Sequence, residues 1–227
     1  MHKVGLVSRD PETFTPLRPT AAPVCVTALE KSPSTPSTSD FPPPCQEPRG
    51  STADAKEQDH ATPGDWDSPT PCTEWSVRDL VNHLVNEQLW VPDLLAGKTV
   101  ADVGDKFDGD LLEDDPLRAW TESSQAARAA WLRPGSLVTI VHLSFGDTDG
   151  AEYCWQMTTD LAVHGWDLAT AVGADAGLGD ELATAVLDHV APQVAAWQGT
   201  SWFADPVPVP DDAAPQARLV ALLGRAP

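Results

Sequence analysis

Apolar residues recur at intervals of three and four positions between residues 76 and 95, which predicts an amphipathic helix. The apolar stripe of this helix consists of Val77, Leu80, Val81, Leu84 and Val85. Ser76 and Asp79 resemble a capping box at its start, with Asp in place of the usual Glu. His83 lies at the border of the stripe.

The same periodicity predicts a second helix, which begins at Asp115 and Pro116. Asp115 can cap this helix, and proline is well suited to a first turn. Its buried side would consist of Leu117, Trp120, Ala127 and Trp131. Residues 136–150 are β-branched and then turn-like, which predicts a short strand or β-hairpin.

Two further helices are expected, at about 151–172, closed by Gly173, and at about 180–198. Pro192 should kink or interrupt the second of these, because proline lacks the backbone N–H that a helix interior needs. A Pro-rich segment and one short helix end the chain. Because helices dominate, the pattern is typical of an all-α antiparallel bundle.

Residues 1–61 have no persistent period and are rich in Pro, Ser and Thr, which predicts a disordered leader. A wrongly assigned start codon would explain this segment as well as a functional tail would. Order is expected to begin near Trp66, so the folded domain is assigned to residues 62–227.

Charge limits the partners that the chain can have. The sequence contains 34 acidic and 14 basic residues, a formal net charge of −20, which disfavours nucleic acids and anionic membranes. No apolar run is long enough to span a bilayer, and the N-terminus has no apolar signal core. The four cysteines show no C-x-x-C spacing. The simplest interpretation is a cytoplasmic protein with free thiols.

The stretch TTDLAVHGWDLATAVG, residues 158–173, places Asp160, His164 and Asp167 on one face of an otherwise apolar helix. A carboxylate on a packed helix is costly unless it is paired or bound to a cation. Asp160 and His164 have the i, i+4 spacing of helical metal sites, and His83 could supply a third ligand from another helix. A plain Asp–His hydrogen bond at the surface would give the same spacing. Asp167 could orient a ligand of the metal, or cap a neighbouring loop.

Other chemically versatile residues have simpler explanations. Cys72 is close to the candidate site in sequence, but a small buried residue in a tight turn accounts for it. The tryptophans at 75, 155 and 166 are interpreted as core and pocket wall. The histidines at 142 and 189 are interpreted as packed or exposed side chains, and those at 2 and 60 belong to the leader.

The segments SPTPCTEWSVRDLVNHLV, VHLSFGDTDGAEY, TTDLAVHGWDLATAVG and ALLGRAP resemble actinobacterial metal-binding proteins related to mycothiol-dependent maleylpyruvate isomerase. These proteins belong to the DinB-like superfamily of four-helix bundles. The resemblance covers roughly residues 66–227. It implies a divalent metal held by His83, Asp160 and His164, with zinc favoured and nickel or iron as alternatives.

The chain departs from the family pattern in three places. The acidic ligand is usually Glu in the isomerase, whereas Asp160 is one methylene shorter. The stretch GSTADAKEQDHATPG cannot supply the amphipathic first helix of the family, so that helix is missing or replaced. A groove left open in this way could be filled by another protein or by a second copy in a homodimer. The isomerase carries a C-terminal domain after its bundle, whereas only a short tail follows the bundle here, so its specific activity is not expected to transfer.

Two functions follow from this resemblance. The first is an enzyme, a thiol S-transferase or isomerase that uses mycothiol and a metal to act on a small electrophile. The second is a non-catalytic metal-binding helical module that binds a protein partner. The sequence reveals no dedicated general base, so no catalytic residue is assigned.

Overall fold

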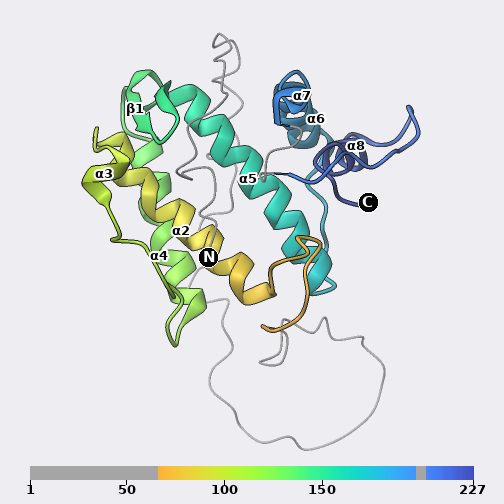
Figure 1. The fold of residues 1–227 in the computed structure, drawn as a ribbon, viewed down its shortest axis with the longest axis horizontal. Coiled ribbons are helices and arrows are strands. Elements are labelled where there is room, and N and C mark those ends of the chain that lie inside the picture. Colours follow the sequence, from red (N-terminus) through yellow and green to blue (C-terminus); the bar gives the residue numbers. More distant parts are fainter. Residues whose placement is uncertain (1–65, 198–202) are drawn as a thin grey trace, which may run out of the picture.

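The computed structural model describes residues 66–197 and 203–227 (Figure 1). The predicted leader, 1–61, lies outside these residues, and so does the stretch interpreted as lacking the first helix. The described chain is mostly helical with one small two-stranded sheet, which confirms the predicted fold class. The four-helix arrangement itself stays a prediction, because it depends on the segment before residue 66.

Helix α2, Val77–Leu95, begins where its sequence predicts. The Ser76 side chain accepts a hydrogen bond from the Asp79 N–H, and the Asp79 carboxylate accepts one from the Ser76 N–H. This reciprocal capping box satisfies two backbone donors and fixes the start of the helix. Helix α3, Val100–Val103, is a single turn with a capping box of its own at Thr99 and Asp102, which the sequence analysis missed.

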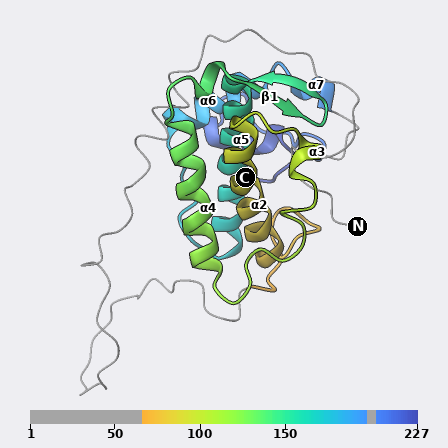
Figure 2. The same ribbon diagram turned by 90° about the vertical axis from the view of Figure 1, so that its left-hand side faces the viewer.

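The chain returns along α2 before α4, Pro116–Trp131, begins. The Asn86 side chain donates to the Phe107 carbonyl, and Asn82 donates to the Gly109 carbonyl. Arg78 lies 2.7 Å from the Asp110 carboxylate, at the N-terminal end of α2. Helix α4 therefore runs parallel to α2, as Figure 2 also shows.

The first turn of α4 differs from the prediction in one residue. Asp115 caps the helix by accepting from the Arg118 N–H, and Pro116 occupies the first turn, as expected. Leu117 is 68% exposed, however, so it does not belong to the buried side. Ala127 and Trp131, farther along the helix, are buried.

Residues 136–149 form a 3-10 turn, Ser136–Val138, and the predicted hairpin of β1, Ile140–Leu143, and β2, Gly146–Asp149. Helix α5, Gly150–Ala171, follows directly and runs antiparallel to α2 (Figure 1). Gly150 lies so close to the Ser136 carbonyl that a side chain at this position would collide with the backbone. The start of α5 is thus built against the turn before the hairpin.

Helix α5 separates two apolar cores. The first packs α5 against α2, α4 and the hairpin, with Trp90, Leu94, Trp131 and Tyr153 among its members. The second packs α5 against the C-terminal helices, with Trp155, Val163, Val186 and Leu219 among its members. Because both sides of α5 are covered, its polar residues are buried as well.

The C-terminal helices are α6, Asp180–Val190, α7, Val194–Trp197, and α8, Pro215–Leu222. The break between α6 and α7 at residues 191–193 confirms the predicted interruption at Pro192. No helix among the described residues is both long and apolar enough to cross a membrane.

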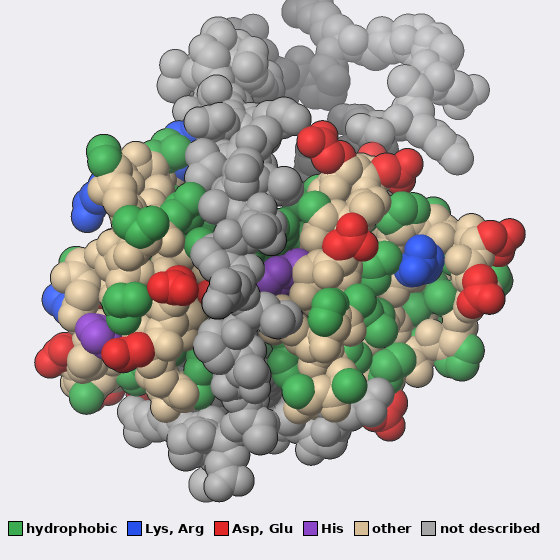
Figure 3. Space-filling model, turned by 90° about the horizontal axis from the view of Figure 1, so that it is seen from above, with side chains coloured by type: hydrophobic (Ala, Val, Ile, Leu, Met, Phe, Trp, Pro, Cys, Tyr) green, Lys and Arg blue, Asp and Glu red, His purple; other side chains and the backbone are tan. Residues whose placement is uncertain are grey.

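The surface in Figure 3 carries acidic side chains on both sides of the view and few basic ones. This distribution agrees with the excess of 34 acidic over 14 basic residues in the sequence. Such a surface would attract cationic ligands and repel anionic ones at long range.

Candidate metal centre

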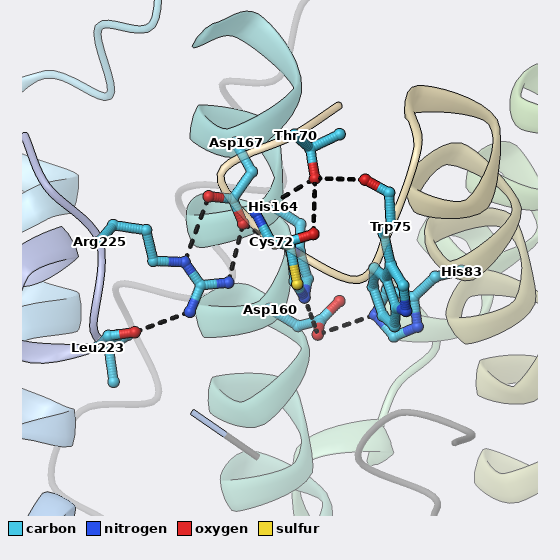
Figure 4. A network of polar contacts seen from close by, with 9 residues as sticks. All are labelled: Thr70, Cys72, Trp75, His83, Asp160, His164, Asp167, Leu223 and Arg225. Carbon is cyan, nitrogen blue, oxygen red and sulfur yellow. Dashed lines mark hydrogen bonds and ion pairs between the residues drawn. The ribbon is translucent and has the colours of Figure 1, made fainter. Parts of the chain in front are cut away.

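Two helices bring the three predicted ligands together (Figure 4). His83 is on α2, and Asp160 and His164 are one turn apart on α5. Nε2 of His83 lies 3.2 Å from Oδ1 of Asp160, and Nε2 of His164 lies 3.6 Å from the same oxygen. One ligand atom from each residue falls within 4.8 Å of the other two. All three side chains are buried.

The electrostatics of this cluster centre on Asp160. Burial acts to raise the pKa of this carboxyl, but the neighbouring His83 and His164 imidazoles outweigh burial, and the pKa is lowered. For His83, burial acts to lower the pKa, and the Asp160 carboxylate reverses this and raises it. Asp160 is therefore held as a carboxylate. Its second oxygen, Oδ2, is buried and has no hydrogen-bond partner among the described residues.

Asp167 holds the other side of the His164 ring. Nδ1 of His164 lies 3.0 Å from Oδ2 of Asp167, so Nδ1–H can donate to this carboxylate. Arg225 donates two hydrogen bonds to the same carboxylate, from Nε at 3.2 Å and from Nη2 at 2.9 Å. Hydrogen bonding at Nδ1 leaves the lone pair of Nε2 facing the cluster, which is the arrangement that orients a ligating histidine.

Arg225 was not identified as a site residue from the sequence. It follows α8, in the terminal segment ALLGRAP, and its Nη1 also donates to the Leu223 carbonyl at 2.7 Å. Burial acts to raise the pKa of Asp167, but hydrogen bonds from His164 and Arg225 lower it. The segment ALLGRAP contributes to the family resemblance, but nothing in its spacing connects Arg225 to an aspartate 58 residues earlier.

The turn before α2 forms one wall of the cluster. The centroid of the Trp75 ring lies 4.7 Å from that of the His83 ring and 5.4 Å from that of the His164 ring, so Trp75 borders the cluster. The Thr70 hydroxyl holds this turn by bonding to the Cys72 and Trp75 carbonyls.

Cys72 belongs to the same turn and is half-buried (Figure 4). Burial raises the pKa of its thiol, which disfavours the thiolate that a nucleophile needs. Cys72 is a free cysteine, whereas Cys154 is disulfide-bonded, so the prediction of free thiols is wrong for Cys154.

Glu87 is a second residue that the sequence analysis missed. It follows His83 by one turn on α2, is fully buried, and has no hydrogen-bond partner for either carboxylate oxygen among the described residues. Burial raises the pKa of Glu87 to about 7. The His83-x-x-x-Glu87 spacing was the available signal, but a glutamate on a helix face usually lies in solvent.

The remaining histidines of the described chain lie elsewhere. His142, in the hairpin, pairs with Asp147 at 2.7 Å. His189, on α6, stacks on Trp155 with ring centroids 4.7 Å apart and lies 3.5 Å from Glu152. Neither histidine joins the His83–Asp160–His164 cluster.

The donor set of this cluster fits a divalent cation. Two imidazole nitrogens and one carboxylate oxygen are ligands that zinc and non-haem iron both accept. An orphaned oxygen on Asp160 and a His164 ring oriented by Asp167 are both expected at such a site. Three protein ligands would also leave coordination positions open to a small molecule.

Comparison with known proteins assigns a family to this arrangement. Residues 55–169 match the family described as the mycothiol maleylpyruvate isomerase N-terminal domain. Two uncharacterized proteins of Mycobacterium tuberculosis, from strains CDC 1551 / Oshkosh and H37Rv, are each 32% identical over 160 residues, which cover 67% of this chain and 81% of the relative. No solved structure matches the chain significantly. The chain therefore belongs to the family of mycothiol maleylpyruvate isomerase N-terminal domains.

Proposed function

We propose that this protein is a metal-dependent enzyme that uses a thiol, mycothiol by family resemblance, in S-transfer to, or isomerisation of, a small electrophile. The observation that supports this proposal most strongly is the buried cluster of His83, Asp160 and His164, whose ligand atoms lie within 4.8 Å of one another. The family match supports the thiol, because its description names mycothiol.

His83, Asp160 and His164 would hold the metal, and zinc is the favoured ion for this donor set, with nickel or iron as alternatives. A divalent metal bound there would lower the pKa of a thiol that reaches it, so that a thiolate is present at neutral pH. Asp167 and Arg225 would keep the His164 ring in its ligating orientation. Trp75 would keep water from one side of the cluster.

The first experiment measures metal content by inductively coupled plasma mass spectrometry on the purified wild type and on His164→Ala. We expect close to one equivalent of metal in the wild type and loss of most of it in the variant. His142→Ala is the matched control, because His142 lies in the hairpin outside the cluster. Absence of metal from the wild type would contradict the proposal.

The second experiment measures consumption of an electrophile, such as 1-chloro-2,4-dinitrobenzene, with mycothiol as the thiol. We expect turnover by the wild type and a loss of at least tenfold in His164→Ala. Metal binding without any turnover would favour the other function considered, a non-catalytic module that binds a protein partner.

A further inference from the structure

Glu87 is a buried carboxyl group beside the candidate metal centre. It does not belong to the proposed set of metal ligands. Its side chain is 0% exposed, and neither oxygen has a hydrogen-bond partner among the described residues. It is not one of the three residues whose ligand atoms lie within 4.8 Å of one another. A buried carboxyl group without a partner is rare, because burial without a hydrogen bond is costly.

Helix α5 carries further buried polar atoms that have no hydrogen-bond partner among the described residues. The Tyr153 hydroxyl, both amide atoms of Gln156 and Oδ2 of Asp160 are buried without hydrogen-bond partners in the described chain. Helical spacing places Tyr153, Gln156 and Asp160 along one stripe of α5. Burial and the nearby Glu87 and Asp160 carboxylates raise the pKa of Tyr153 well above its usual value. Tyr153 therefore remains a neutral hydroxyl near both carboxylates.

The buried ionisable groups around this stripe are the Glu87 and Asp160 carboxyls and the His83 and His164 imidazoles. Glu87 and Asp160 are both carboxyl groups, and the Arg225 guanidinium is committed to Asp167 through two hydrogen bonds. A carboxylate ligand would bring a further acceptor to a place that already has unpartnered acceptors, whereas an amine or hydroxyl donor would find an acceptor in Glu87.

We propose that Glu87 binds the thiol cosubstrate by accepting a hydrogen bond from an amine or hydroxyl group, so that the site selects neutral or positively charged thiols and rejects carboxylate thiols. This inference rests on the proposed function. Residues one helical turn apart have Cβ atoms about 5–6 Å apart. Glu87 therefore lies one turn from the candidate ligand His83 on α2, and a thiol with its donor two carbons from sulfur is the size of probe that suits this spacing.

The test compares four small thiols by calorimetric titration into the zinc-loaded full chain. The probes are 2-aminoethanethiol, 2-mercaptoethanol, ethanethiol and mercaptoacetate, which differ in donor and charge but little in size. We expect 2-aminoethanethiol to bind at least tenfold more tightly than mercaptoacetate, with 2-mercaptoethanol above ethanethiol.

Two substitutions isolate the role of Glu87. Glu87→Gln keeps the shape of the side chain and removes the charge, so the preference for 2-aminoethanethiol over mercaptoacetate should fall to within about threefold while zinc content is unchanged. Glu87→Asp keeps the charge and should keep most of the preference. Glu122→Gln makes the same chemical change at an exposed position of α4 and should behave as the wild type.

The outcomes separate this inference from the proposed function. If the zinc-loaded wild type binds none of the thiols, the proposed function fails and the inference fails with it. If the thiols bind but mercaptoacetate binds as tightly as 2-aminoethanethiol, the proposed function stands and the inference is overturned. An unchanged preference in a folded Glu87→Gln protein also overturns it.

Discussion

At the scale of single residues, the ion pair of Asp167 and Arg225 can be tested by substitution. Both are buried, and Arg225 donates two hydrogen bonds to the Asp167 carboxylate. Removing one partner of a buried ion pair leaves a charge without compensation, which costs about 3–5 kcal/mol. Arg225→Met should therefore lower the free energy of unfolding by about that amount, measured by urea denaturation.

The same substitution should also weaken metal binding by about 10–100-fold, because Asp167 then loses the contact that holds it against His164. Arg118→Met is the matched control. Arg118 pairs with Glu122 at an exposed position, so its loss should cost less than about 1 kcal/mol. A similar cost at both positions would show that the buried pair contributes no more than a surface pair.

Glu87 predicts a pH dependence of stability for the metal-free protein. Burial raises its pKa to about 7, from an ordinary value of 4.5. The folded state therefore favours the protonated form. The stability that this form contributes is fully present below pH 4.5 and is lost as the pH rises through about 7.

We expect the metal-free wild type to lose stability relative to Glu87→Gln between pH 5 and pH 8, measured by urea denaturation after chelation. Glu122→Gln, which removes an exposed carboxyl, should follow the wild type over the same range. Parallel curves for the wild type and Glu87→Gln would mean that the Glu87 carboxyl finds a partner in the folded protein.

At the scale of secondary structure elements, the entry into α5 predicts contrasting effects at two glycines. A side chain at Gly150 would collide with the Ser136 carbonyl, whereas Gly165 has no atom within 4 Å of the place that a Cβ would take. Gly150→Ala should therefore destabilise the protein by about 1–3 kcal/mol, the usual cost of overpacking. Gly165→Ala should stabilise it by about 0.5–1 kcal/mol, because alanine loses less entropy in a helix. Thermal denaturation of the two variants and the wild type shows whether each substitution raises or lowers the stability.

The elements themselves could largely be predicted from the sequence, because their signals are local. Ser76 and Asp79 are three residues apart, and the capping box that they form marks the start of α2 in both sequence and structure. Pro192 interrupts its helix for a reason contained in one residue. The single turn α3 was missed because four residues are too few for a hydrophobic period.

Long-range features of the site could be predicted only in part. His83 and Asp160 carry ligand chemistry that draws attention in any sequence, and the structure places them 3.2 Å apart. Arg225 and Glu87 were missed because their roles depend on contacts between elements. An arginine near the end of a chain and a glutamate on a helix face usually lie in solvent, and only the fold buries them here.

At the scale of the whole molecule, the candidate metal centre joins parts of the chain that are far apart in sequence. His83 comes from α2, Asp160 and His164 from α5, and Arg225 reaches the same place from the end of α8. A ligand that binds only the folded state adds to its stability by mass action. A metal held here should therefore stabilise α2, α5 and the C-terminal segment together.

This linkage predicts how removal of the metal changes the stability of the protein. At a free metal concentration 100 times the dissociation constant, binding adds about 2.7 kcal/mol to the free energy of unfolding. Chelation with 1,10-phenanthroline should lower the melting temperature of the wild type, and added zinc should restore it. His164→Ala should melt at the same temperature with and without the chelator.

A wild type that still melts cooperatively after chelation retains its fold without metal, as an enzyme with an exchangeable ion would. Complete loss of the transition would mean that the metal is needed for folding, the behaviour expected of the non-catalytic module.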